Sequence, residues 1–307
     1  SVSVVHLAIG SPAADTLQCR LDGEEVTAVD SLLRPAAERG SAVTLEANEA
    51  GSFVGSYVLG KGFVLTPEER AALVKSDKRN AERIFPYIGF DELNTSPTQS
   101  PHRYVINFWD FNLEEAGKWP DLLKIIRTEV KPERDKVNRK ALKERWWQYA
   151  DKRPGLYQAL KSLDRCLACS RHSKHSVFAF QPTDRVFSEA LVVFPLPAYA
   201  HFGLLQSRIH EFWARLQGST LEDRLRYSPS DCFETFPFPD ELTLAADKPL
   251  EAIAKCLYEI RAAYMVATDQ GLTKTYNALT DPTNTDPEIE NLRRLHEQLD
   301  RAVLDAY

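Results

Sequence analysis

The chain has 307 residues and a formal net charge of −6, and 43% of its residues are hydrophobic. These proportions are typical of a soluble globular protein, and the length suffices for one large domain or two ordinary ones. Apolar runs such as residues 190–194 are much shorter than the roughly 18 residues that a membrane span needs. We therefore expect no membrane-spanning segment and no membrane partner.

The cysteines indicate the expected cellular location of the protein, and the chain ends indicate the extent of the polypeptide. Five cysteines stand at positions 19, 166, 169, 232 and 256, and this odd, scattered set does not suit a disulfide framework. A reducing cytoplasm is the expected location. Residues 1–10 begin like a strand without an initiator Met or signal peptide, and residues 301–307 end within a helical pattern. Both ends indicate a piece of a longer polypeptide.

Charge is unevenly distributed along the chain. Residues 124–174 hold fifteen Lys and Arg against six Asp and Glu, a local charge of +9, so the remainder carries −15. Such asymmetry is typical of an anion-binding face on an acidic body. A solvated helical surface with ion pairs remains the alternative at this point.

The first half of the chain mixes short strands with helices. We predict strands over 2–8, 52–59 and 103–109, where β-branched and aromatic residues gather. Thr66, Pro67 and Glu69 form a capping box that predicts a helix start. A basic amphipathic helical stretch is expected over 120–149, interrupted near Lys131-Pro132, followed by a helix over 156–163.

The second half continues the mixture and ends in helices. Strands are predicted over 164–170, 176–180 and 185–195, and residues 221–227 have strand alternation. One helix is expected over 201–217, with Leu205, Ile209, Phe212, Trp213 and Leu216 on one face. After the proline-rich segment 233–240, two amphipathic helices at 248–267 and 287–306 form a hairpin. The expected class is α+β, a mixed twisted sheet with packed helices and a small C-terminal helical hairpin.

Residues 166–175, CLACSRHSKH, contain the ligand types of a zinc site at a spacing of three. Zinc ligand pairs are normally a dozen or more residues apart, so that the chain can wrap the ion. At a spacing of three, the side chains of Cys166, Cys169, His172 and His175 would not converge on a strand or on a helix. A buried strand with a basic loop at its end is the favoured interpretation, and a zinc-binding interaction module is an alternative.

A second alternative is a metal-dependent nuclease. Asp121, Glu129 and Lys131 have the residue types of a restriction-nuclease metal site. Such a site needs its Glu and Lys on a strand, whereas residues 122–130 have helical spacing. We found no other catalytic motif in the chain.

Residues 221–227, LEDRLRY, suit the reading of base edges. Strand alternation places Glu222, Arg224 and Arg226 on one face, about 6.6 Å apart. Arg can bind guanine through two hydrogen bonds, and Glu can accept from the cytosine amino group. A surface strand with cross-strand ion pairs remains the alternative from spacing alone.

Several stretches together resemble the target-recognition region of MmeI-like type IIL restriction–modification proteins. They are GSYVLGKGFVLTPEE (55–69), RNAERIFPYI (79–88), SPHRYVINF (100–108), VKPERDKVNRK (130–140), WWQYADKRPGLYQAL (146–160), VFSEALVVF (186–194), HFGLLQSRIHEFW (201–213) and GSTLEDRLRYSPSDCFETFPFP (218–239). The tail resembles the C-terminal helical segment of that family. The resemblance runs in order over nearly the whole chain.

The resemblance implies roles for particular residues. Glu222 and Arg224 match positions that choose a base pair, Arg226 is expected as a further reader, and Ser188 and Glu189 match a second readout position. The expected phosphate contacts are Arg171, Ser173, Lys174, Lys136, Arg139 and Lys140. The sequence departs from the family at Cys169, which replaces a branched aliphatic residue, and at Arg171, His172 and His175.

The resemblance also implies an organisation. Residues 1–20 would continue from a methyltransferase domain, 21–240 would be the DNA target-recognition domain, and 241–307 the C-terminal helical segment. The expected partners are double-stranded DNA and a methyltransferase domain of the same polypeptide. The chain itself would be non-catalytic and need no cofactor. S-adenosylmethionine, Mg²⁺, adenine-N6 methylation and DNA cleavage would belong to the parent protein.

Overall fold

The computed structural model describes residues 19–29, 35, 42–221, 224–240 and 247–307. The chain divides into a small unit, residues 1–43, and a large unit, residues 44–307. In the small unit, β1 (Cys19–Leu21) and β2 (Glu24–Val26) pair antiparallel. Asp22 and Gly23 connect them with φ values of 52° and 89°, a positive pair that matches the twist of a tight hairpin. The strand predicted over 2–8 lies outside the described residues.

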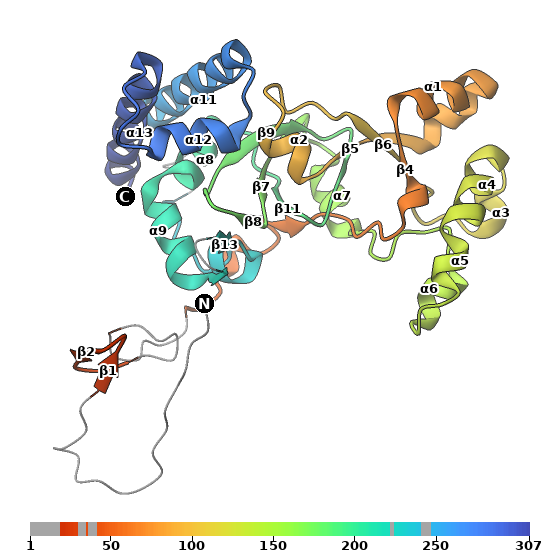
Figure 1. Ribbon diagram of the computed structural model, residues 1–307, viewed down its shortest axis with the longest axis horizontal. Helices are drawn as coiled ribbons and strands as arrows, with labels where there is room; N and C mark the ends of the chain where they lie inside the picture. The colour runs from red at the N-terminus through yellow and green to blue at the C-terminus, as the bar shows by residue number, and fades with distance from the viewer. Residues whose placement is uncertain (1–18, 30–34, 36–41, 222–223, 241–246) are drawn as a thin grey trace, which may run out of the picture. The chain divides into compact units, whose positions relative to one another are not determined.

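The large unit combines short strands with helices (Figure 1). Its strands are β3 (Phe53–Val54), β4 (Val64–Leu65), β5 (Ile84–Ile88), β6 (Arg103–Ile106), β7 (Arg165–Ser170), β8 (His172–Ser173), β9 (Phe178–Pro182), β10 (Val186–Phe187), β11 (Leu191–Phe194), β12 (Ser219–Leu221) and β13 (Arg224–Arg226). Its helices are α1 (Pro67–Ser76), α2 (Phe90–Asn94), α3 (Leu113–Ala116), α4 (Pro120–Glu129), α5 (Lys131–Arg134), α6 (Lys140–Glu144), α7 (Pro154–Leu160), α8 (Tyr199–Gln206), α9 (Arg208–Gln217), α11 (Lys248–Thr268), α12 (Leu272–Thr280) and α13 (Pro287–Asp305). The predicted α+β class with a C-terminal helical region is confirmed. Among the described residues, no helix is long and apolar enough to cross a membrane.

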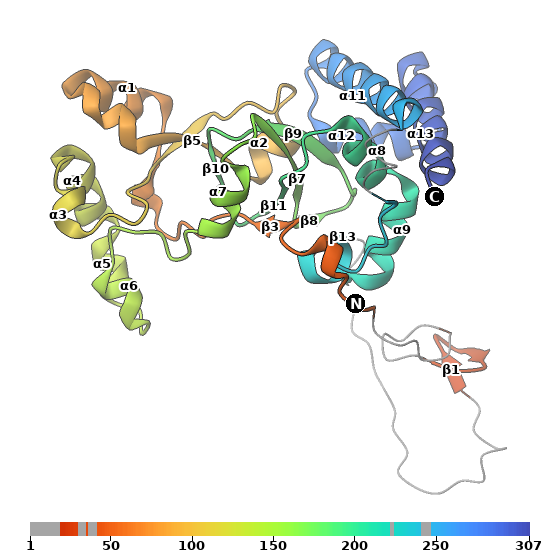
Figure 2. The ribbon, with the colours of Figure 1, turned by 180° about the vertical axis from the view of Figure 1, so that it is seen from behind.

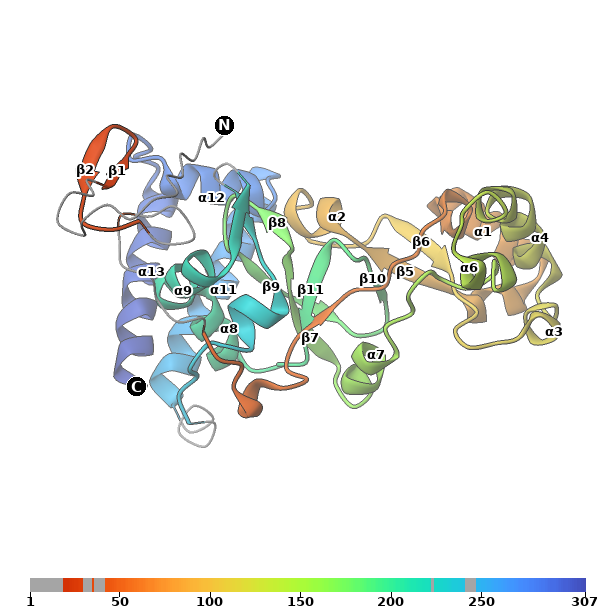
Figure 3. The same ribbon diagram turned by 90° about the horizontal axis from the view of Figure 1, so that it is seen from below.

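A four-stranded sheet, β3-β11-β7-β9, lies at the centre of the large unit and is buried on both faces. Along β7, Leu167 and Cys169 enter one core cluster, whereas Cys166 and Ala168 enter another. The first cluster includes residues of α8, α9, α11 and α13, and the second includes residues of α7 and α12. Figure 3 shows α8 and α9 on one side of β7 and β11, and α7 on the other. Burial on both faces explains the nearly continuous apolar sequence of these strands.

A second sheet, β10-β5-β6-β4, forms a separate core with α4 and the aromatic residues of the segment 146–149. Its β10 and β5 strands are parallel, and the remaining pairs are antiparallel. Arg134 of α5, which is 2% exposed, donates to the carbonyl oxygens of Val58 (3.2 Å) and Leu59 (2.7 Å) and so joins this helix to the chain before β4. Figure 2 shows α1, α4 and α6 grouped together, apart from α11 and α13.

The structure confirms several local predictions. The Thr66 hydroxyl accepts from the Glu69 N–H (3.2 Å), and the Glu69 carboxylate accepts from the Thr66 N–H (2.8 Å), so the capping box opens α1. The basic helical stretch after Pro120 is interrupted before Lys131 as expected, and a further break follows α5.

Two helical predictions need correction. The single helix expected over 201–217 is two helices, because Ser207 leaves the helical conformation and its hydroxyl caps α9 by accepting from the His210 N–H. This break changes the phase of the apolar face, so Phe212 is 70% exposed and not part of the core. The C-terminal hairpin contains an additional helix, α12, between α11 and α13.

The start of the large unit is joined to the segment that follows β13. Asn48, which is 7% exposed, donates through its side-chain amide to the carbonyl oxygens of Phe233 (3.1 Å) and Phe236 (2.7 Å). The Leu45 N–H donates to the Glu234 carbonyl oxygen (2.8 Å). These bonds fix the backbone of the proline-rich segment.

We predict that Asn48→Ala destabilises the protein by about 1–3 kcal/mol, because it leaves buried carbonyl groups without donors. Thermal and urea unfolding would measure the loss. Asn138→Ala, at an exposed asparagine, is the matched control and should leave the unfolding midpoint unchanged. Equal midpoints for the two variants would show that the Asn48 side chain contributes no net stability.

Candidate nucleic-acid interface

The first part of the candidate interface is the short strand β13. Arg224 and Arg226 are exposed, whereas Leu225 (3% exposed) and Tyr227 (1% exposed) point into the core. The predicted alternation is therefore present from Arg224 onward. The buried positions anchor the strand and hold both guanidinium groups on its outer face.

The prediction of one strand over 221–227 is wrong. β12 and β13 are separate strands that pair antiparallel, with Leu221 opposite Arg224 and Ser219 opposite Arg226. The chain reverses between them, and a period-of-two pattern carries no signal for a reversal. Glu222, the proposed acidic reader, lies outside the described residues.

The basic segment that follows β7 lies directly beside β13. β8 pairs antiparallel with β13, so that Ser173 is opposite Leu225 and His172 is opposite Arg226. The Tyr227 N–H also donates to the Arg171 carbonyl oxygen (2.8 Å). Side chains directly opposite on paired strands are about 4.5–5.5 Å apart at Cβ. The structure thus brings together two segments more than fifty positions apart, one with expected base readers and one with expected phosphate contacts.

Arg171 connects this pair of strands to the second proposed readout position. Its N–H donates to the Ala190 carbonyl oxygen (2.9 Å), and its guanidinium donates to the Glu189 carbonyl oxygen (3.2 Å). Ser188 is 7% exposed, and its hydroxyl donates to the Glu189 carboxylate (3.1 Å) and accepts from the Ala190 N–H (3.2 Å). Ser188 therefore orients Glu189, and Glu189 is the partly accessible member of the pair.

Positive groups are crowded at this junction. Burial lowers the pKa of Arg171, and the neighbouring guanidinium groups of Arg226 and Arg153 lower it further. Burial and the same Arg171 and Arg226 groups lower the pKa of His172. The Arg171 Nε is buried and has no hydrogen-bond partner. Like charges on adjacent strands repel one another, and a bound anion would relieve this repulsion.

Arg153 lies in the basic stretch 124–174 that was expected to bind anions, but it was not among the residues singled out from the sequence. It precedes α7 in a left-handed conformation, with φ of 53°, and forms an ion pair with Asp151 (3.3 Å). Its effect on Arg171 places it at the same junction. The local signal in the sequence was the position of Arg153 directly before Pro154. A residue before proline is disfavoured in the right-handed helical conformation, so Arg153 is expected to adopt another one.

The remaining expected phosphate contacts fall into two groups. Lys174 is exposed directly after β8. Lys136, Arg139 and Lys140 are exposed in and before α6, and Figure 1 shows α6 at the other end of the large unit from β13. Arg139 lines a hollow of about 240 Å³ with Arg145 and Lys152. Lys140 pairs with Glu144 (3.5 Å). The structure does not bring this second group to β13, and its role stays a prediction.

Comparisons with known proteins agree with this arrangement. The family model described as the MmeI target recognition domain matches residues 45–240, which is more than half of the chain. The chain belongs to this family.

Two relatives place the target recognition domain within longer proteins. DNA methyltransferase A of Bacillus subtilis (strain 168) is 36% identical over 107 residues, which are 34% of this chain and 11% of the methyltransferase. A solved structure of the Type IIL restriction–modification enzyme MmeI in complex with DNA has a TM-score of 0.71 at 21% identity, over 92% of this chain and 36% of that chain. The chain therefore spans only a minor part of the length of both relatives, and the second likeness shows the fold.

The target recognition domain places the zinc-ligand residue types apart from one another. Cys166 and Cys169 belong to different core clusters, on opposite faces of β7. Burial raises the pKa of the Cys166 thiol to about 12 and that of Cys169 well above its ordinary value. His172 lies on the exposed side of β8, and His175 is bonded to Asn277 (2.8 Å). These positions agree with the buried strand, whereas the segment expected as a basic loop contains the strand β8.

The alternative nuclease centre is not assembled either. Asp121 lies in the first turn of α4 and accepts from the Ser76 hydroxyl (3.1 Å), whereas Glu129 is the last residue of the same helix. Eight residues of α-helix separate them by about 12 Å. Lys131 pairs with Asp135 (2.6 Å). Across the described part of the chain, no group of three or more His, Cys, Asp or Glu side chains could hold a metal ion.

We predict that EDTA treatment leaves the unfolding temperature of the chain unchanged, because the two thiols at 166 and 169 cannot face one ion. Scanning calorimetry before and after dialysis, together with elemental analysis, would test this. Loss of a stoichiometric metal together with a lower unfolding temperature would contradict this placement of the thiols.

Proposed function

We propose that this chain reads a short sequence in double-stranded DNA for a restriction–modification methyltransferase. The observation that carries the proposal is the pairing of β13 with β8, which sets exposed Arg224 and Arg226 beside Arg171 and His172. Membership in the target recognition family and the fold of a DNA-bound relative support it.

The strands β13 and β8 suit the two components of duplex recognition, which are base contacts and phosphate contacts. Arg224 and Arg226 have the length and the planar donors to reach guanine O6 and N7 in the major groove. Arg171, Ser173 and Lys174 would contact phosphate oxygens, which give affinity without sequence information. Glu222 and Glu189 would accept from cytosine amino groups, and Ser188 would orient Glu189.

The rest of the proposed activity belongs to the parent polypeptide. We assign to it adenine-N6 methylation with S-adenosylmethionine and cleavage with Mg²⁺, in the cytoplasm. This chain contains no Asn-Pro-Pro-Tyr motif and no glycine-rich loop of the kind that binds S-adenosylmethionine, so its residues do not fit that cofactor. Its described residues also contain no group of three or more carboxylates, thiols or imidazoles that could hold Mg²⁺. Its role in that reaction is to bind the site and orient the duplex, and the methyltransferase domain would complete the DNA-binding cleft.

Selection of bound duplexes from a random library, with the protein in its full natural length, tests the proposal. We expect enrichment of one short site, and we expect methylation of an adenine in that same site when genomic DNA is sequenced. Failure to enrich any site, with duplex binding that is indifferent to sequence, would overturn it.

We predict that Arg224→Ala relaxes preference at one base pair and weakens binding of the preferred duplex by about 1–3 kcal/mol, because one bidentate base contact is lost. Lys174→Ala should weaken all duplexes alike and reduce the salt slope by about one. Competition binding against single-base variants, repeated over a salt series, separates the two effects.

Lys255→Ala is the charge-matched control, because Lys255 lies on α11 and pairs with Glu259 (3.8 Å). It should alter neither base preference nor salt slope. Identical base preferences in the Arg224→Ala variant and the unmodified protein would remove Arg224 from the set of base readers.

We predict that DNA affinity increases as the pH falls from 7.5 to 5.5, because phosphate would raise the pKa of His172, which burial, Arg171 and Arg226 lower in the free protein. A group with a higher pKa in the complex takes up a proton on binding, so acid favours the complex. Affinity can rise up to about tenfold for each unit by which the pKa increases. His172→Gln should flatten this dependence, whereas His102→Gln, before β6, should not.

A further inference from the structure

The C-terminal helices share a buried polar network with the central sheet. Arg261 of α11 is 2% exposed, and its guanidinium donates to the Phe178 carbonyl oxygen (2.8 Å), the Tyr276 hydroxyl (3.0 Å) and the Gln206 amide oxygen (3.2 Å). The rings of Phe202 and Tyr258 lie 5.1 and 5.0 Å from it. No carboxylate of the described residues pairs with this cation. A buried charge is costly unless its hydrogen bonds are satisfied, so the network requires its partners in place.

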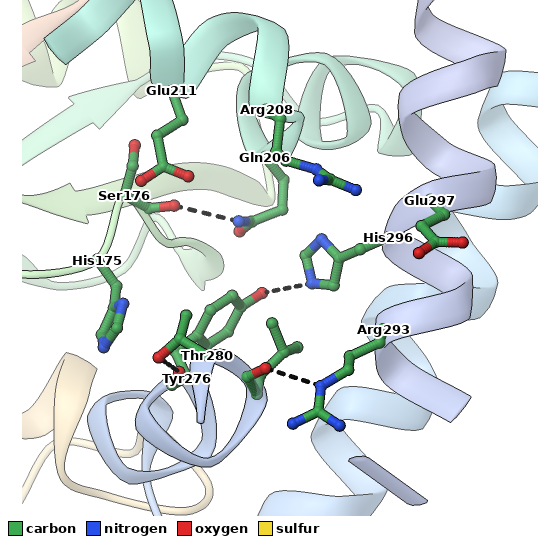
Figure 4. Close-up of a pocket in the computed structure, with 11 residues that line it drawn as sticks. His175, Ser176, Gln206, Arg208, Glu211, Tyr276, Thr280, Arg293, His296 and Glu297 are labelled. Atoms are coloured by element: carbon green, nitrogen blue, oxygen red, sulfur yellow. Dashed lines mark hydrogen bonds between the residues drawn. The ribbon is translucent and has the colours of Figure 1, made fainter. Parts of the chain in front are cut away.

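The network holds the backbone immediately after the basic segment. The Gln206 side chain accepts from the Phe178 N–H (3.0 Å) and donates to the Ser176 carbonyl oxygen (3.1 Å). Ser176 follows His175 directly, and Phe178 begins β9. Figure 4 shows Ser176, Gln206, Tyr276 and His296 around one pocket, with the Ser176–Gln206 and Tyr276–His296 bonds drawn. Through Arg261 and Tyr276, helices α11 and α12 are thus connected to the residues that follow Lys174 in the chain.

A second set of bonds holds the basic segment itself. His175 Nε2 lies 2.8 Å from the Asn277 amide oxygen of α12, and Arg215 of α9 donates to the Lys174 carbonyl oxygen (2.7 Å). His175 also lines the pocket of Figure 4, which has a volume of about 320 Å³. The Lys174 ammonium is exposed, whereas its carbonyl oxygen is bonded to α9 and the side chain of the next residue, His175, is bonded to α12.

The basic segment needs this external support because its own ladder is short. β8 has two residues and is the edge strand of the sheet β12-β13-β8, so among the described strands β13 is the one that pairs with it. Two-stranded and two-residue pairings have little stability of their own. Since Ser173 pairs with Leu225, any shift of β8 would also displace Arg224 and Arg226.

We propose that the C-terminal helices act as a positioning device for DNA binding, with Asn277 as the positioning residue for the segment 172–175 through His175. Arg261 and Gln206 hold the adjoining residues Ser176 and Phe178. The inference rests on the proposed DNA-reading function and adds the C-terminal helices to it. Neither helix needs to contact the duplex for this role.

Asn277→Ala tests the proposal, because Asn277 is exposed and its loss should not disturb the core. We expect faster hydrogen exchange of the backbone amides of residues 172–177, and a two- to tenfold weaker affinity for the selected duplex and for an unrelated duplex of equal length. The unfolding temperature should stay within about 2 °C of the unmodified protein, as expected for a single exposed bond. All measurements use the protein in its full natural length.

Three companion variants separate positioning from other effects. Asn291→Ala removes a side chain that accepts from Arg294 on α13 (2.8 Å), and it should change neither exchange nor affinity. His175→Ala should weaken affinity at least as much as Asn277→Ala, because it also removes the ring contact with Tyr276 (6.1 Å between centroids). The double variant should be no weaker than His175→Ala alone, because Asn277 acts through His175. Tyr276→Phe, which removes a hydroxyl from the Arg261 network, should accelerate exchange at Ser176 to Phe178.

The outcomes of these experiments distinguish the positioning role from the proposed DNA-reading function. Unchanged exchange in Asn277→Ala, or altered exchange with unchanged DNA affinity, overturns the positioning role while leaving the proposed function intact. Additive losses in the double variant also overturn it. An unmodified protein that binds no duplex removes the proposed function, and the inference that depends on it.

Discussion

The candidate interface depends on two backbone hydrogen bonds at one residue. The Arg171 N–H donates to Ala190, and the Arg171 carbonyl accepts from Tyr227. These bonds join the end of β7 to the segment before β11 and to the end of β13. The segment before β11 and the three-residue strand β13 are short, and their exposed side chains depend on this connection to β7. Because the joining bonds are between backbone groups, the side chains of the neighbouring positions are left free to meet a partner.

Rigidity beneath this junction comes from the central sheet. β7 and β11 are buried on both faces, so the chain that leaves them starts from a fixed position. At the surface, the charges of Arg226 and Arg153 lie close enough to that of Arg171 to repel it. This repulsion destabilises the junction that the packing holds together. A packed scaffold can maintain such repulsion, and the repulsion favours occupation by a polyanion. The junction therefore favours negative charge at the place where the proposed readout side chains, Arg224 and Arg226, emerge.

What could be predicted from the sequence depended on how local each signal is. The capping box at Thr66 and the alternation of Arg224, Leu225, Arg226 and Tyr227 involve residues a few positions apart, and both were predicted. Hydrophobic periodicity was misleading where Ser207 interrupts a helix, because the pattern continues across a break that the pattern itself does not encode. Phe212 was placed in the core for that reason, and it is exposed.

The assembled site needed the tertiary structure. Arg171 and Arg226 are basic residues of the same chain, but nothing in their spacing shows that their strands pair. The residue separation between Arg261 and Phe178 is 83, and no periodic signal spans it. Arg153 was missed because its importance comes from its neighbours in space. The comparisons show the family, and the geometry supports the proposal for how these particular residues act.

The division of labour within β13 has a consequence for how such a protein can change. Leu225 and Tyr227 supply the packing, so substitutions at 224 and 226 alter the exposed chemistry at little cost to folding. A lineage could therefore acquire a new target by one or two outward replacements, without passing through an unstable intermediate. Replacement of Leu225 or Tyr227 would reduce the amount of folded protein before any change of target could be selected.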